Sequence, residues 1–403
     1  MKTICLVGCT SRKLSAPHPA EELYDSALFD GARYFSKTRC DQWHILSAKH
    51  GLVAPRQILK PYNQSLLEID SGRRMIWAKD VFCALQNTSS EHDKIIFLAG
   101  KQYREFLTPM LLERGNSVAA PLASFGIGKQ VAWLQKLMKE PERLKDLDRL
   151  YDLMSRLSAG LNGSRLLAES DGKKSWPEKG LYLFFEPSEF RMSSPFDQRL
   201  VRIGTHAVSR GSMTTLWDRL RTHRGASDGT GNHRGSIFRL HVGEAFRRRL
   251  HVDETYPHWG HGQSATALIR QTEIELEKRV SEYLGRMSLL WIAIGDTAGP
   301  QSDRAYLERN IIGLISGPTG PMDASSRSWL GNDSTKSAIS SSGLWNINHV
   351  GHIYDRRMLD VLEQYIEVTI GKSPSFKQSI APRNWHSPSS ASSLYTSDQL
   401  DLQ

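Results

Sequence analysis

Arginine is concentrated in one short stretch in the second half of the chain. Eight arginines fall within 44 residues: Arg191, Arg199, Arg202, Arg210, Arg219, Arg221, Arg224 and Arg234. Because guanidinium groups bind phosphate oxygens through planar, paired hydrogen bonds, this density indicates a surface that holds a phosphate backbone. Contacts of this kind position a nucleic acid without reading its sequence, so we expect little sequence specificity here. Arg219 lies four residues before His223, which places both on one face of a helix.

The elements that must position these side chains follow a definite order. The pattern of apolar residues predicts two strands over 180–186 and 199–206, a helix over 216–224, a strand over 289–294 and a helix over 303–315. The first two strands are expected to form a hairpin with an enlarged turn. An insertion lies between the two helices, and in it we expect a strand from Ile237 to Val242 and a helix around Ser264 to Leu284.

This order of elements resembles the GIY-YIG nuclease superfamily. Its motifs are a Gly-Ile-Tyr strand, a Tyr-Ile-Gly strand, a helix with Arg-Leu-x-x-His, and a later helix with a glutamate. The matching residues are Gly180-Leu181-Tyr182, Arg202-Ile203-Gly204, Arg219-Leu220 with His223, and Glu308. The sequence departs from the family at one position, because Arg202 stands where the family has its second tyrosine.

The resemblance implies a metal-dependent phosphodiesterase with an α+β fold built on a small mixed or antiparallel sheet. Tyr182 would deprotonate or orient the attacking water, with His223 as its partner, and Arg219 would clamp the scissile phosphate. Glu308 would hold one hard cation, Mg²⁺ or Mn²⁺, in a site completed by water and substrate. The expected substrate is nucleic acid, with DNA favoured over RNA.

The basic residues and the motifs together predict a set of nucleic-acid contacts around this site. The sequence leaves open which of Asn332, Asn346 and Asn348 corresponds to the family's closing asparagine. The full expected set is Arg202, Gly204, Arg221, Arg224, Arg234 and Asn346.

Each of these residues also has an ordinary structural explanation. Tyr182 can pack in a core, Arg219 and His223 can lie on a solvated helix face, and Glu308 can form a helix ion pair with Arg304 or Arg309. Arg202 keeps open the alternative that the domain binds nucleic acid or nucleotides without cutting them.

The first 140 residues alternate strand and helix patterns, which predicts an α/β domain with a mainly parallel sheet. Strands are expected over 3–8, 43–47 and 94–100. Polar side chains follow these strands, where ligands of such sheets usually bind. A pocket for a nucleotide, a phosphate or a flipped base is expected at Cys9, Ser11, Lys13, Lys49, His50 and Lys101. A small buried cysteine followed by solvated turns is the competing interpretation.

This region resembles an uncharacterised bacterial α/β domain with Cys-Ser-x-x-Lys and Ser-Ala-Lys-His-Gly-Leu motifs, matched here from Cys9 to Lys13 and from Ser47 to Leu52. More distantly it is similar to peroxide-stress proteins and to glycosylase-like domains. The resemblance therefore leaves a glycosylase-like or nucleotide-processing activity of this domain as a third possibility.

Length and composition fit this division. With 403 residues the chain exceeds one ordinary core, and the formal charge of +9 favours a polyanionic partner. The expected domains are 1–140, a helical connector over 141–175, the nuclease-like domain over 176–371 and a flexible serine-rich tail over 372–403. No apolar run reaches the roughly 20 residues that span a bilayer, and the four cysteines fit reduced thiols. We expect a cytoplasmic protein, suited to genome defence or DNA processing.

Overall fold

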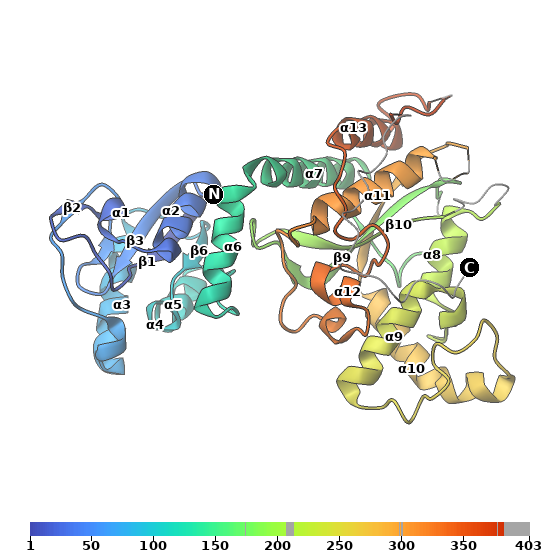
Figure 1. Cartoon of the computed structure of the whole chain (residues 1–403), viewed down its shortest axis with the longest axis horizontal. Helices are drawn as coiled ribbons and strands as arrows, with labels where there is room; N and C mark the ends of the chain where they lie inside the picture. Colours follow the sequence, from blue (N-terminus) through green and yellow to red (C-terminus); the bar gives the residue numbers. More distant parts are fainter. Residues whose placement is uncertain (174, 207–212, 298, 300, 377, 383–403) are drawn as a thin grey trace. The chain divides into compact units, whose positions relative to one another are not determined.

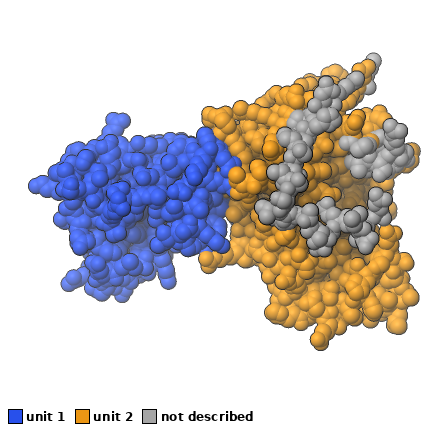
Figure 2. All heavy atoms as spheres, in the orientation of Figure 1, with its two compact units in different colours: residues 1–141, 190–197 blue, residues 142–189, 198–403 orange. Residues whose placement is uncertain are grey.

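A computed structural model describes residues 1–382 apart from 174, 207–212, 298, 300 and 377 (Figure 1). The chain divides into two compact units, coloured separately in Figure 2. Unit 1 comprises residues 1–141 and 190–197, and unit 2 comprises 142–189 and the chain from 198 onward. Of the expected tail, the part from 383 lies outside the described residues. No helix in the described part of the chain is long and apolar enough to cross a membrane.

Unit 1 is built on a five-stranded sheet in the order β4-β3-β1-β6-β7. Its strands are β1 (Thr3–Gly8), β3 (Gln42–Ser47), β4 (Gly51–Val53), β6 (Lys94–Leu98) and β7 (Ser117–Ala119). All neighbours pair in parallel except β4, which runs antiparallel to β3. A small antiparallel pair stands apart, formed by β2 (His18–Pro19) and β5 (Ile58–Leu59). The predicted α/β class with a mainly parallel sheet is confirmed.

Helices cover this sheet and close its core. They are α1 (Ala20–Leu23), α2 (Ala27–Arg39), the 3₁₀ turn η1 (Leu66–Glu68), α3 (Ser71–Gln86), α4 (Lys101–Arg104), α5 (Leu107–Glu113) and α6 (Ile127–Lys139). The core cluster joins Leu6 and Phe97 of the central strands to Val81 of α3 and Leu111 of α5. Each of these side chains is fully buried or nearly so. The sheet thereby becomes a rigid platform whose carboxyl edge carries the expected pocket residues.

One expectation about the cysteines is wrong. Cys5 of β1 and Cys40, which follows α2, form a disulfide with their Cα atoms 6.1 Å apart. Among the described residues, the other two cysteines, Cys9 and Cys83, are free. Sequence spacing gives no sign of the pair, because the 35-residue separation is closed by the β1–α2–β3 crossover.

Unit 2 contains a four-stranded sheet in the order β10-β9-β11-β8. The strands are β8 (Arg165–Leu166), β9 (Gly180–Phe190), β10 (Gln198–Thr205) and β11 (Ser288–Ala293). Strand β11 runs antiparallel to both β8 and β9, with Trp291 opposite Tyr182. The predicted α+β class with a small antiparallel or mixed sheet is therefore confirmed.

Helices of unit 2 flank this sheet (Figure 1). They are α7 (Pro141–Gly160), α8 (Leu216–Arg224), α9 (Ile237–Leu250), α10 (Ala267–Gly285), α11 (Asp303–Ser316), α12 (Ser337–Ser342) and α13 (Met358–Thr369), with 3₁₀ turns η2 (His233–Gly235) and η3 (Leu330–Asp333). Two of these helices carry predicted site residues: α8 carries Arg219 and His223, and α11 carries Glu308.

Helix α7, expected as a connector, packs within unit 2 and is tied to the end of α11. Arg143 donates hydrogen bonds of 3.0 Å to the carbonyl oxygens of Leu314 and Ile315. These carbonyls belong to the last turn of α11, where no intrahelical donor is available, and a cation there also complements the helix dipole. Arg143 therefore fixes the C-terminal end of the helix that carries Glu308.

The predicted strand over 237–242 is wrong, because these residues begin helix α9. Ser236 caps the helix by accepting a hydrogen bond from the backbone N–H of Arg239. Phe238, Val242 and Ala245 recur at helical spacing and are fully buried. The alternation of apolar and polar residues is real, but burial of this face in the core of unit 2 decides the structure.

Candidate active site

A hydrogen-bonded chain of three buried side chains lies at the centre of unit 2. Tyr182 projects from β9, and its hydroxyl lies 3.0 Å from Nε2 of His223 on α8. The other ring nitrogen, Nδ1, lies 2.7 Å from Oγ of Ser236. All three residues are at most 1% exposed. The sequence-predicted pair of Tyr182 and His223 is thus brought together by neighbouring elements.

The hydrogen-bond network favours one tautomer of His223. Ser236 Oγ accepts a hydrogen bond from the backbone N–H of Arg239. The Ser236 hydroxyl hydrogen is therefore best donated to His223 Nδ1, which is the acceptor within reach among the described residues. The proton of the neutral ring then sits on Nε2, which donates to Tyr182 Oη. Burial, followed by the charges of Arg219, Arg202 and Arg239, holds the pKa of His223 well below its usual range. The ring is therefore neutral at physiological pH.

Gly204 on β10 lies directly against the tyrosine hydroxyl. A Cβ atom at this position would stand 2.2 Å from Tyr182 Oη. The glycine of the second motif therefore permits a close approach of backbone to the catalytic candidate, in addition to any contact it makes with nucleic acid.

We expect Gly204→Ala to displace Tyr182 and reduce cutting while costing about 1–3 kcal/mol of unfolding free energy, the usual range for overpacking a core. The measurements are nuclease rate and urea unfolding. Gly295→Ala is the matched control, because a Cβ there meets nothing within 4 Å. Parental rate and stability in Gly204→Ala would show that the close approach has no consequence.

Glu308 of α11 faces the end of β10, on which this helix packs. Its side chain is partly exposed, and its carboxylate accepts a hydrogen bond from the backbone N–H of Thr205. Burial raises its pKa to about 7, against the opposing charges of Arg202 and Arg219 and the Thr205 hydrogen bond. Among the described residues no ion pair neutralises this carboxylate, although the charges of Arg202 and Arg219 act on it, and perturbed carboxylates of this kind are typical of functional sites.

Arg219 completes the central group. It lies on α8 one turn before His223, and its charge acts on both His223 and Glu308. Its guanidinium makes no hydrogen bond or ion pair with the described residues, and it is partly exposed. The Tyr182–His223 pair and Glu308 are thus linked through the charge of Arg219, which is itself available to an incoming anion.

Arg202 and Asn346 have structural partners. Arg202 donates to the carbonyl oxygen of Trp345 and stacks its guanidinium 4.5 Å above the ring of Phe238. The Asn346 amide pairs with both backbone groups of Ile203, at 3.1 Å and 2.7 Å. Because β10 is an edge strand, the Asn346 amide takes the place of the backbone of a neighbouring strand. Arg202 still acts on Glu308 through its charge.

The other predicted phosphate contacts differ in availability. Arg221 is exposed and makes a loose ion pair of 3.7 Å with Asp218. Arg224 donates to Ser170 and lies 5.6 Å from the ring of Trp217. Arg234 is buried in a two-pronged pair with Glu273, so it is not available to a substrate. Arg210 lies outside the described residues.

Sequence reasoning missed three residues that shape this site. Ser236 and Arg239 come from the insertion, and Arg239 donates to the carbonyl oxygen of His223 at 2.9 Å. His206 follows β10, where burial and then the charge of Arg304 lower its pKa to about 4. A serine before an apolar run does mark Ser236 as a helix cap, but no sequence pattern shows that it also reaches His223.

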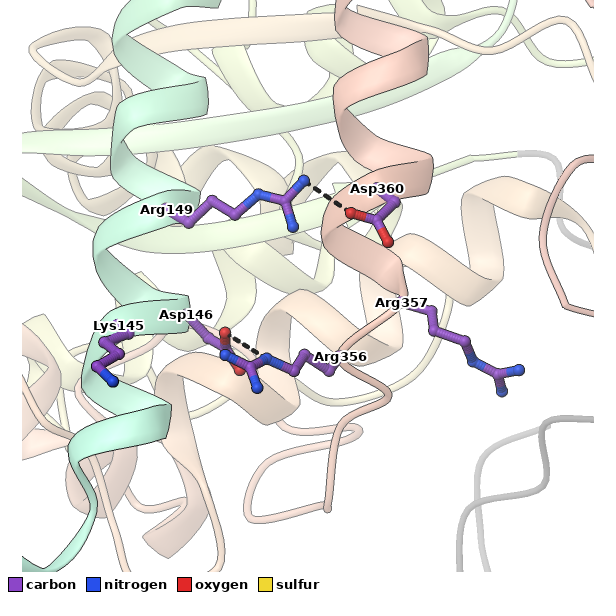
Figure 3. A pocket seen from close by; sticks show the side chains of 6 residues that line it. All are labelled: Lys145, Asp146, Arg149, Arg356, Arg357 and Asp360. Carbon is purple, nitrogen blue, oxygen red and sulfur yellow. Dashed lines mark hydrogen bonds and ion pairs between the residues drawn. The ribbon is translucent and has the colours of Figure 1, made fainter.

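A surface pocket of about 410 Å³ lies elsewhere in unit 2. Figure 3 shows its lining, formed by the α7 side chains Lys145, Asp146 and Arg149 and by Arg356, Arg357 and Asp360 at the start of α13. Arg149 pairs with Asp360 at 2.7 Å and Arg356 with Asp146 at 2.8 Å. These paired charges clamp α7 to α13, and no candidate catalytic residue lines the pocket.

In unit 1 most of the expected pocket residues converge. Lys13 Nζ lies 4.3 Å from the ring centre of Tyr62, and Lys49 Nζ lies 5.9 Å from the same ring. The His50 ring meets Tyr62 edge-on at 5.2 Å. Ser11 is exposed and contributes its carbonyl oxygen to Lys13. Lys101 opens α4 at the same edge of the sheet.

The donor set around Glu308 suits a hard divalent cation held mainly by water and substrate. No group of three or more potential metal-ligating side chains occurs in the described part of the chain. Mg²⁺ is commonly bound through one or two carboxylates together with substrate phosphates. Glu308 is such a single carboxylate, partly exposed beside a free arginine.

A small sheet that carries a buried tyrosine, flanked by helices that supply arginine, histidine and glutamate, defines a nuclease-type domain. The family model of the GIY-YIG domain matches residues 141–371, more than half of the chain, and the chain belongs to this family. A separate family of unknown function (DUF6884) matches residues 4–136.

Among curated proteins, the chain is similar to the uncharacterized protein YfjM of Bacillus subtilis (strain 168). The two are 27% identical over 159 residues, which cover 36% of this chain and all of YfjM. None of the solved structures matches the chain.

Proposed function

We propose that this protein is a divalent-metal-dependent endonuclease that hydrolyses phosphodiester bonds in nucleic acid, with DNA as its substrate. The observation that carries the proposal is the free guanidinium of Arg219 beside Glu308 and the Tyr182–His223 pair. A structural arginine in such a position would be expected to pair with the glutamate. In the proposed complex, the anionic partner of Arg219 is a phosphate of the substrate.

In the proposed reaction each side chain has a distinct task. Tyr182 Oη orients the attacking water, and the hydrogen bond from His223 Nε2 holds that oxygen in position. Arg219 binds a non-bridging oxygen of the scissile phosphate. Glu308 would hold the divalent cation. A cation bound there supplies neutralisation of the phosphate charge and assistance to the leaving oxygen.

The insertion contributes to the same task by holding His223 in place. Ser236 fixes the ring through Nδ1, and Arg239 fixes the backbone of the same residue. A histidine held at both its ring and its carbonyl keeps the tyrosine hydroxyl oriented before substrate arrives.

We assign unit 1 the role of recognising the target or a nucleotide, a pairing that suits genome defence or DNA processing. The net charge of +9 supports a polyanionic substrate. Exposed arginines such as Arg221 supply contacts that position the backbone without reading bases.

The test is incubation of the purified protein with supercoiled plasmid in Mg²⁺, Mn²⁺ or EDTA. We expect nicking with either metal, none in EDTA, and a steep fall in rate as salt rises, because phosphate contacts release counterions. Salt-sensitive binding without cutting in any metal would contradict the proposal and favour a binding domain that has lost its activity.

A further inference from the structure

The carboxyl edge of the parallel sheet in unit 1 contains a second cluster of reactive side chains. Strand β3 lies on one side of β1 and β6 on the other, so the strand order reverses between β1 and β6. Open α/β sheets bind ligands at this point, outside the carboxyl ends of the strands. Cys9 directly follows β1, and Tyr103 lies in α4 just after β6. Their Sγ and Oη atoms are 3.1 Å apart.

A second group of hydrogen-bonded hydroxyls lies at the same edge. Tyr62 Oη lies 2.9 Å from Tyr24 Oη and 2.7 Å from Oγ of Ser47, the last residue of β3. Five segments of the chain, at Cys9, Tyr24, Ser47, Tyr62 and Tyr103, thus meet at one edge. Ser47 is buried, whereas Cys9, Tyr62 and Tyr103 remain partly exposed and open to solvent.

The cations of this cluster lack acidic partners. Lys13 Nζ is held by the carbonyl oxygens of Thr10 and Ser11, at 3.0 Å and 3.2 Å, and lies over Tyr62. Among the residues that the structure describes, no carboxylate lies within ion-pair distance of Lys13, Lys49 or Lys101. Unit 1 therefore builds a fixed lysine at the strand edge and leaves its charge without a counter-ion.

We propose that unit 1 binds a phosphorylated ligand at this edge, with its phosphate on Lys13 and Lys49 and the remainder beside Tyr62, Tyr103 and Cys9. Lysine is a common phosphate ligand, and tyrosine rings and hydroxyls accept the sugar or base that accompanies a phosphate. The phosphate belongs to a free nucleotide or to the end of a nucleic acid strand. The site deepens the recognition role proposed for unit 1, but binding to it does not require that the protein cuts.

Alkylation of the full-length protein by iodoacetamide tests the site. Cys9 reports on the site, and Cys83, exposed on α3, serves as the internal control. EDTA is present throughout to chelate divalent cations and so prevent metal-dependent cutting of the probes. The probes are inorganic phosphate, nucleoside 5′-monophosphates, the corresponding nucleosides, and a hexadeoxynucleotide with and without a 5′-phosphate. Mass spectrometry gives the alkylation rate of each cysteine.

We expect a phosphorylated probe to slow alkylation of Cys9 several-fold without affecting Cys83. Protection by mononucleotides would identify a free nucleotide as the ligand, and protection by the phosphorylated hexamer alone would identify a strand end. Lys13→Met and Lys49→Met should weaken protection about tenfold, the value of a hydrogen bond to a charged group. Lys79→Met, at an exposed position of α3, should not.

The proposal is overturned if no phosphorylated probe protects Cys9, or if the unphosphorylated probes protect it equally well. It is also overturned if protection survives both lysine substitutions. Because Lys49 is exposed, its variant tests the site even if Lys13→Met does not fold. A protein that binds in EDTA but never nicks plasmid would leave this inference standing while the nuclease proposal fails.

Discussion

Glu308→Gln is expected to abolish metal-dependent cutting while leaving the fold intact. The amide keeps the size of the side chain and can still accept the backbone N–H of Thr205, but it cannot supply the anionic oxygen that the cation requires. Loss of the charge that neutralises the transition state should reduce the rate by at least about a hundredfold. The measurement is the nicking rate of supercoiled plasmid in Mg²⁺ and Mn²⁺.

Stability separates a functional role of Glu308 from a structural one. Its pKa in the folded protein is raised to about 7, so the folded state prefers the protonated carboxyl and loses stability as pH rises through that value. A neutral glutamine does not carry this cost. In EDTA at pH 8, Glu308→Gln should therefore unfold at or above the parental temperature.

A conservative change at an ordinary surface glutamate provides the control. Glu282 of α10 forms an exposed pair with Arg286, and Glu282→Gln should leave both cutting and stability nearly unchanged. If Glu308→Gln cuts at the parental rate, the metal role assigned to Glu308 is wrong. If it unfolds at a much lower temperature, the residue stabilises the fold instead.

The elements that carry the candidate residues can be predicted from the sequence, because short motifs fall on segments whose periodicity is clear. Tyr182 lies in a continuous apolar strand, and the four-residue spacing of Arg219 and His223 is a property of any helix. Glu308 follows from the order of the motifs. The structure brings all of these residues together, and their catalytic roles stay proposals.

Residues around this centre could not be predicted, because their roles depend on contacts between distant segments. Arg199 is a basic residue in the sequence, yet it is buried against Glu189 at 2.5 Å. Arg234 is likewise buried in an ion pair with Glu273. A count of arginines therefore overstates the charge available to phosphate. Asn346 shows the same limit, since an amide that supports an edge strand looks in sequence like a ligand-binding residue.

The insertion illustrates how packing overrides local pattern. An alternating stretch from Ile237 to Val242 predicts a strand, but burial of Phe238 and Val242 in the core of unit 2 makes it a helix. The helix then brings Ser236 and Arg239 to His223. No local signal contains this result, because the partner segment lies some forty residues away at Glu277.

Glu277→Gln is expected to destabilise unit 2 strongly, because it breaks a buried network in the insertion. One carboxylate oxygen accepts the backbone N–H of His233 and faces its ring Nδ1 at 3.0 Å, and the other accepts Nε and Nη2 of Arg239. Burial would raise the pKa of Glu277, but the hydrogen bond from His233 and the charge of Arg239 outweigh it and lower the pKa. In the glutamine variant, the side-chain NH₂ group faces hydrogen-bond donors of either His233 or Arg239, so one set of hydrogen bonds is lost. The charge of Arg239 also loses its carboxylate partner.

Removing one partner of a buried ion pair usually costs about 3–5 kcal/mol, whereas exposed pairs contribute about 0–1 kcal/mol. Urea unfolding of Glu277→Gln beside Glu282→Gln measures the difference. The double variant Arg239→Met with Glu277→Leu should recover part of the loss, since no charge stays buried without a partner. It should not recover the nicking rate, because Arg239 also holds the carbonyl of His223. Equal unfolding curves for the two glutamine variants would show that the network does not hold the insertion against the site.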